Sequence, residues 1–354
     1  DPPRWAEDAN AIYVDDGVVY HAHWVVLGED DRAPAGLAVL QAGEDATLPP
    51  TAPMPMYLDS PGFTVIEDGD ALRVVVPADR VRRQLDFEAG ALTAYMEVST
   101  ADGPLLSVHG VLSQLDEGAL TLSVADAELA ATGAWPEGAV DASDDALAIQ
   151  DASAVYLESL DTYVFRQRVT GTAAAQVPAT VGKVDGAPVL GYVFPTTIVP
   201  STLGFRGIDD GTLTLAVTSH PDFGDTPFFD ENQDGVYDND GATYHVHWAV
   251  LADDAASPAG LSVPSQPDAT QLPPTAPMPM YLDSPGYHAF ATGDTLVVLV
   301  PGWHLDGPGF TFDAVTARMR VDVSGPGPVL RVEDVVSVLS GDLSLPLTPT
   351  TATR

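Results

Sequence analysis

The feature of this sequence that most constrains its fold is an internal repeat. The segment YHAHW at residues 20–24 returns as YHVHW at residues 244–248. Residues 48–62 return letter for letter as residues 272–286, at the same offset of 224 residues. The second copy therefore preserves the spacing as well as the motifs, which indicates one structural unit built twice.

The repeat divides the chain into three parts. We expect unit A at residues 1–125, a non-repeated β domain at residues 126–224, and unit B at residues 225–354. Each part is long enough to be a domain of its own. The whole chain of 354 residues is longer than one ordinary hydrophobic core supports, which favours the same division.

Hydrophobic patterning predicts β structure almost throughout. Stretches rich in β-branched, aromatic and other apolar residues occupy residues 18–27, 72–76, 92–98, 155–169 and 213–217. Glycine and proline turn signals separate such stretches, and no segment keeps a helical period with caps at its ends. We therefore predict an all-β fold of tandem β-sandwich-like domains, with the first and third as internal repeats.

Composition limits the partners and the chemistry. The chain has 51 acidic residues against 14 basic ones and a formal charge of −37, which disfavours nucleic acid and anionic membranes as partners. There is no cysteine, which excludes disulfides, thiolate zinc sites and iron–sulfur clusters. No apolar run reaches the length of a membrane span, so we expect no membrane insertion. Asp1 in place of methionine favours a mature secreted, cell-surface or periplasmic protein whose signal peptide has been removed.

A calcium-type loop opens unit B. Oxygen side chains recur at the first, third, fifth and ninth positions with glycine at the sixth, the spacing of an EF-hand loop. Gly241 stands where that loop carries its bidentate glutamate, and unit A lacks the ligand set. We predict calcium here, as a structural brace. The expected ligands, with a backbone carbonyl from the valine, are Asp230, Asn232, Asp234, Val236, Asp238 and Asp240.

Histidines and methionines form a second constellation, present in both units. Residues two apart on a strand share a face, so the two histidines of each His-x-His motif project together. Each Met-Pro-Met run is held extended by its proline and presents both sulfurs on one side. Two imidazoles and two thioethers suit copper. The candidate copper ligands are His21, His23, Met54 and Met56 in unit A, and His245, His247, Met278 and Met280 in unit B.

Core packing is the interpretation that we favour for these residues, because methionine commonly fills cores and histidine packs or bonds internally. Copper is the alternative. Haem with His/Met ligands would use the same residue types, and zinc would need Asp59 or Asp283 as a further ligand. The segment His220-Pro221-Asp222 could contribute to the shell of the calcium-type loop or be a plain loop, and we favour the plain loop.

No catalytic motif stands out, since there is no Gly-x-Ser-x-Gly elbow, His-Glu-x-x-His motif or phosphate loop. The sequence predicts a non-enzymatic, calcium-binding extracellular or cell-surface module that binds a ligand or assembles with copies of itself through exposed edge strands. The alternative is a periplasmic or secreted copper-binding protein.

Overall fold

The structure, a computed structural model, confirms an all-β protein. It describes residues 19–40, 57–59, 63–81, 87–99, 105–115, 135–140, 143–208, 210–221, 241–265, 281–283, 287–305, 307–325 and 329–352. Within these ranges the regular elements are strands and 3-10 helices of three or four residues. None of the helices in the described ranges has the length and apolar character that crossing a lipid bilayer requires.

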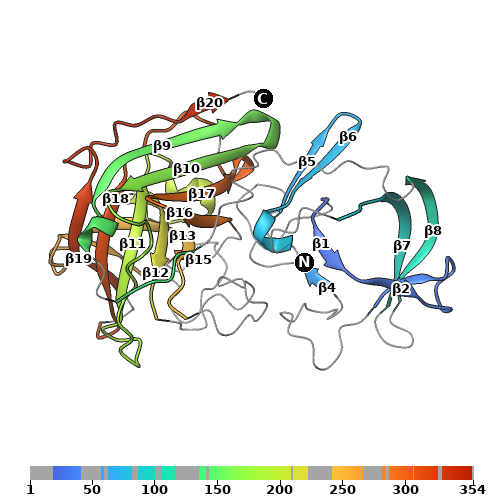
Figure 1. Cartoon of the computed structure of the whole chain (residues 1–354), viewed down its shortest axis with the longest axis horizontal. Helices are drawn as coiled ribbons and strands as arrows, with labels where there is room; N and C mark the ends of the chain where they lie inside the picture. Colours follow the sequence, from blue (N-terminus) through green and yellow to red (C-terminus); the bar gives the residue numbers. More distant parts are fainter. Residues whose placement is uncertain are drawn as a thin grey trace.

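The first group of strands lies in unit A. Its elements are β1 (His23–Val25), β2 (Leu27–Glu29), β3 (Leu37–Val39), β4 (Tyr57–Asp59), β5 (Thr64–Asp68), β6 (Ala71–Val75), η1 (Ala78–Val81), β7 (Ala91–Ser99) and β8 (Leu105–Leu115). They form a four-stranded sheet in the order β2-β3-β8-β7 and two separate pairs, β1-β4 and β5-β6 (Figure 1).

The second group follows in the middle segment, residues 126–224. It comprises η2 (Asp144–Ala146), β9 (Ile149–Leu157), η3 (Glu158–Leu160), β10 (Thr162–Val169), β11 (Pro188–Pro195), η4 (Pro200–Leu203) and β12 (Thr212–Ser219). The β-rich stretch 155–169 is divided between two strands, because the chain turns through η3. Asp161 ends that turn in the left-handed conformation (φ 42°).

Unit B supplies the remaining strands. They are β13 (His245–Asp253), β14 (Leu261–Val263), β15 (Tyr281–Asp283), β16 (Ala289–Thr292), β17 (Thr295–Pro301), η5 (Gly302–His304), β18 (Val315–Asp322), β19 (Val329–Val338) and β20 (Thr350–Ala352).

One sheet of this second half closes on itself. Its strands run in the order β12-β11-β18-β19-β14-β13-β15, and β12 also pairs with β13. The six strands from β12 to β13 therefore form a closed ring, which leaves none of those strands at a free sheet edge. Inside the ring lies an apolar core that includes Val189, Ala249, Met319 and Val332.

A five-stranded sheet in the order β16-β17-β10-β9-β20 packs against the ring as a second layer (Figure 1). The main core lies between the two layers and combines Tyr163 and Phe165 of β10 with Trp248 of β13. Alternation along β13 explains how one strand serves two cores. Val246 and Trp248 join the core between the layers, whereas Ala249 belongs to the core inside the ring. The sandwich-like layering expected from the sequence is present.

Both sheets mix strands from the middle segment and from unit B. β11 pairs with β18, β12 pairs with β13, and β10 pairs with β17. The boundary at residue 224 is therefore a boundary in the sequence and does not separate two sheets. The three-part division itself remains a prediction.

The strands of units A and B pair in the same order and register. Trp24 lies opposite Leu58 in unit A, and Trp248 lies opposite Leu282 in unit B. The long hairpins β7-β8 and β18-β19 share even their irregularities. Each changes register twice, first after Thr93 and after Thr316. Matching bulges of this kind set the twist and bend of a strand pair.

Candidate metal centre

Three histidines meet at one end of the closed ring. His245 and His247 stand two apart on β13 and share its inner face. On the neighbouring strand β12, Thr218 lies opposite His245, and Ala216 lies opposite His247. The chain leaves β12 at Ser219, so the next residue, His220, lies two residues beyond Thr218, the partner of His245. Antiparallel pairing of β12 with β13 thus places all three side chains together.

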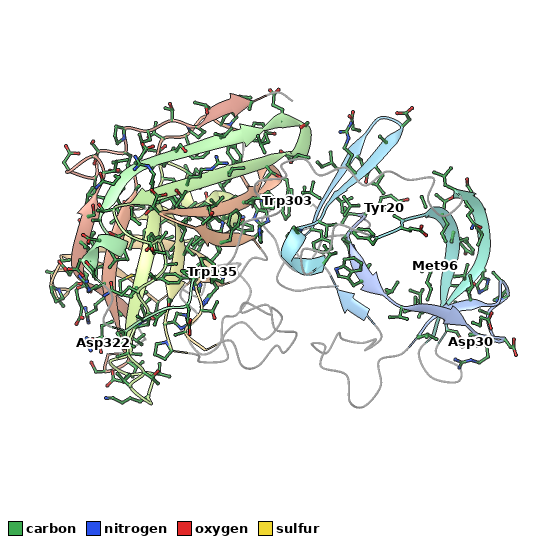
Figure 2. All side chains as sticks on the ribbon, viewed as in Figure 1. Tyr20, Asp30, Met96, Trp135, Trp303 and Asp322 are labelled. Atoms are coloured by element: carbon green, nitrogen blue, oxygen red, sulfur yellow. The ribbon has the colours of Figure 1, made fainter. Side chains whose placement is uncertain are left out.

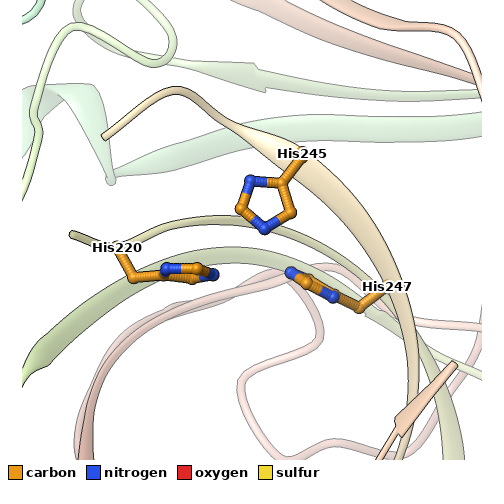
Figure 3. Close-up of side chains that lie close together, drawn as sticks. All are labelled: His220, His245 and His247. Carbon is orange, nitrogen blue, oxygen red and sulfur yellow. The ribbon is translucent and has the colours of Figure 1, made fainter. Parts of the chain in front are cut away.

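The three rings form a compact histidine cluster. The His245 ring centroid lies 4.6 Å from that of His220 and 4.5 Å from that of His247. One ring nitrogen of each residue lies within 4.8 Å of the others, and all three side chains are buried. Figure 3 shows the three rings turning a nitrogen toward a common point. Among the described residues, this is the one group of three or more side chains placed to hold a metal ion together.

Backbone carbonyls orient two of the rings. Nδ1 of His220 lies 3.0 Å from the carbonyl oxygen of Pro221, and Nδ1 of His245 lies 3.1 Å from that of Thr243. A carbonyl can only accept, so each Nδ1 carries the proton and donates it. Each Nε2 then holds the lone pair, which is the form of imidazole that ligates a metal.

Two of the three histidines line an apolar cavity. His220 and His247 line a space of about 40 Å³ inside the ring, together with Met319 and aliphatic side chains such as Val189 and Val193. The thioether of Met319 is therefore the soft donor type that the structure brings into the same cavity as the histidines.

Among the described residues, the other metal ligands predicted from the sequence do not belong to this histidine cluster. His21 and His23 lie together in unit A, with ring centroids 4.4 Å apart, but belong to no group of three metal-ligand side chains among the described residues. Met54, Met56, Met278, Met280 and the calcium-type loop from Asp230 to Asp240 lie outside the described residues. The backbone of Asp283 pairs with His247, and that of Asp59 pairs with His23.

His220 is the member of the histidine cluster that the sequence interpretation missed. It was expected in a plain loop, and it does follow a strand, but its side chain is buried in the cluster. It has no counterpart in unit A, so comparing the two copies could not reveal it. The available signal was its place three residues beyond the apolar run at residues 213–217, once that strand is paired with the His-x-His strand.

A second histidine network lies on the other face of β13. Trp248 Nε1 donates to the Tyr287 hydroxyl at 2.9 Å, and that hydroxyl bonds to Nδ1 of His304. Complete burial lowers the pKa of His304 to about 3, so its imidazole is neutral at physiological pH. Trp248 packs in the core between the layers, which separates this network from the histidine cluster inside the ring.

Comparison with protein-family models, with curated proteins and with solved structures finds no match. The function must therefore be argued from the chemistry of the site.

Proposed function

We propose that this chain is a non-enzymatic metal-binding protein that holds one copper ion at His220, His245 and His247. The observation that carries the proposal is the convergence of three buried imidazoles, with ring nitrogens within 4.8 Å of one another. Neutral imidazole is a good ligand for copper and zinc. Two of the three rings are already oriented by backbone carbonyls, as the rings of metal-ligating histidines commonly are.

Copper is favoured over zinc by the surroundings of the cluster. Three imidazoles supply no negative charge, and the space beside them is lined mainly by apolar side chains. Burying a doubly charged ion there costs more than burying a singly charged one, which favours Cu(I). Zinc held by three histidines would take water as its fourth ligand, which a space lined mainly by apolar side chains disfavours. The Met319 thioether in the same cavity suits copper and not zinc.

Long-range electrostatics support cation capture. A formal charge of −37 raises the local concentration of cations around the protein and speeds their encounter with it. An exported location, where copper and calcium are both encountered, forms part of the proposal.

Copper competition tests the proposal directly. We expect one Cu(I) per chain to resist a chromogenic chelator at micromolar protein, and the His220→Ala variant to lose that ion. His288→Ala is the matched control, because His288 is buried outside the cluster. Equal copper retention in both variants, or a preference of the wild type for zinc over Cu(I), would contradict the assignment.

A second role rests on the calcium-type loop. Four oxygen side chains with EF-hand spacing, in a chain of this acidity, favour a calcium-braced cell-surface or extracellular module that binds a ligand or self-associates. Sedimentation velocity with about 2 mM calcium and with chelator tests this role. This calcium concentration exceeds the dissociation constant of extracellular calcium modules, which is about 10⁻⁴–10⁻³ M. A monomer under every condition would count against assembly.

A further inference from the structure

Within the described residues, the sheet of unit A has counterparts of four of the six strands of the ring, and it is not closed. Its order β2-β3-β8-β7 corresponds to β13-β14-β19-β18 in unit B. In unit B the strands β11 and β12 close the gap between β18 and β13. Among the described residues, β7 pairs only with β8, and β2 pairs only with β3. Within the described part of unit A, β7 and the stretch formed by β1 and β2 therefore each present a strand edge where the matching strands of unit B have partners.

Apolar side chains that are buried in unit B are exposed at the matching positions of unit A. Figure 2 labels two of them, Tyr20 and Met96. Tyr20 is 74% exposed and its match Tyr244 is 3% exposed; Trp24 is 43% exposed and Trp248 0%. Leu72 is 59% exposed and Leu296 0%, and Val74 is 47% exposed and Val298 0%. Met96 is 38% exposed and Met319 5%. Exposed apolar surface on this scale marks an interaction site.

The cover in unit B comes from one continuous stretch, residues 143–221, which we name the donor segment. Its strands β11 and β12 complete the ring, and β10 extends the hairpin β16-β17 into the second layer. The matching hairpin of unit A, β5-β6, pairs with no further strand among the described residues. Each strand pairing that the described part of unit A lacks is thus one that the donor segment supplies to unit B.

The histidines of unit A likewise match those of unit B except for the one that the donor segment supplies. The rings of His21 and His23 lie 4.4 Å apart with an interplanar angle of 65°, and those of His245 and His247 lie 4.5 Å apart at 67°. The third member of the cluster in unit B, His220, is carried by the donor segment at the end of β12. Unit A therefore holds two thirds of the same histidine arrangement.

We propose that unit A is the acceptor half of a second closed ring. Its occupant is a partner polypeptide carrying an uncommitted four-stranded segment of the donor type, with a histidine directly after its last strand. Such a segment would pair with the free edge of β7 and with the edge of residues 21–27, which include β1 and the start of β2 and match the part of β13 that pairs with β12. It would cover Trp24 and Leu72 and add a third imidazole to His21 and His23. Binding by strand addition of this kind supplies backbone hydrogen bonds and side-chain burial together.

A second copy of this chain is a poorer occupant. The donor segment of residues 143–221 is already paired with β13, β17 and β18 of its own unit B. A copy that gave its donor segment to a neighbour would expose its own unit B, so the number of uncovered faces would not fall.

The experiment supplies a donor segment to the full chain by fusing an additional copy of residues 126–224 ahead of Asp1. The junction of Gly224 with Asp1 reproduces the native junction of Gly224 with Asp225, because Asp1 and Asp225 are matching positions of the repeat. We expect amide hydrogen exchange in β7 to slow by at least tenfold and the bound copper to rise from one ion to two.

Two variants of the added copy serve as controls. His220→Ala should keep the slowed exchange but lose the second copper ion. Val193→Pro, in the middle of β11, should abolish both effects, since proline cannot donate to the sheet.

The docking part of this inference does not depend on copper. Unchanged exchange in β7 of the fusion would overturn it, whether or not copper binds. Slowed exchange without any copper would leave the docking intact and contradict only the proposed function. Concentration-dependent association of the unmodified chain, with slowed exchange in β7, would identify a second copy as the occupant and overturn the choice of partner.

Discussion

Leucine truncations at matching positions of the two units measure directly how different their surroundings are. Leu72 in β6 and Leu296 in β17 follow the same Gly-Asp turn and hold the same place in the repeat. Leu296 is fully buried in the core between the layers, whereas Leu72 is 59% exposed. The substitutions Leu72→Ala and Leu296→Ala remove the same atoms from these two environments.

The expected costs follow from burial. Removing a fully buried leucine side chain down to alanine costs roughly 2–5 kcal/mol, the sum of lost transfer free energy and the cavity left behind. We expect about 3 kcal/mol for Leu296→Ala, since both layers of the core surround it. At Leu72 less than half of the side chain leaves water and no closed cavity forms, so the transfer contribution alone predicts below about 1 kcal/mol.

Urea unfolding followed by circular dichroism and tryptophan fluorescence provides the measurement, with thermal unfolding as a check. For a folding unit of 150–250 residues, a loss of about 3 kcal/mol lowers the melting temperature by roughly 6–12 °C. The matched variant Leu72→Ala should shift the melting temperature by no more than a few degrees. Equal losses in the two variants would refute the open face of unit A, because they would require Leu72 to be buried in solution.

Three further predictions concern pH, packing and calcium. Burial lowers the pKa of His304 from its ordinary 6.5 to about 3. The stabilising effect of His304 is therefore complete above about pH 6.5 and is lost as the pH falls toward 3. With chelator present, His304→Gln should reduce the fall of the melting temperature across that pH range. A Cβ at Gly191 would lie 2.8 Å from Cε of Met319, so Gly191→Ala should cost about 1 kcal/mol by urea unfolding, and less when Met319 is also shortened to alanine. Calcium at millimolar concentration should raise the melting temperature of the wild type but not of Asp230→Ala; an equal rise in both would place the calcium effect elsewhere.

Much of the fold could be predicted from local patterns. The apolar stretches at residues 92–98 and 213–217 fall within β7 and β12, and the stretch at residues 72–76 overlaps β6 as far as Val75, because β-branched and aromatic residues favour half-buried strands. Closure of the ring could not be predicted this way. It depends on β11 pairing with β18 and β12 with β13, and such long-range pairings leave no mark on the pattern of either strand alone.

Part of the candidate site could likewise be predicted from local sequence, and part of it could not. The alternation of His245 and His247 predicted a shared face, which the structure confirms, because side-chain direction along a strand is a local property. His220 required knowledge of which strand lies beside β13. The repeat itself also drew attention away from His220, since unit A has no copy of the segment that carries it.

Ring closure and the histidine cluster are parts of one arrangement. β12 closes the ring by pairing with β13, and the same pairing delivers His220 to His245 and His247. An ion held by all three imidazoles would therefore cross-link the last pair of strands to close, and it would bind tightly only where that pair has formed. Unit A shows the opposite arrangement within the same chain. Among the described residues it has the matching histidines His21 and His23, but its sheet is open, its apolar positions are exposed and no third imidazole joins the pair. The number of copper ions bound per chain should therefore equal the number of closed rings. A measurement of that number tests both the proposed function and the proposed partner.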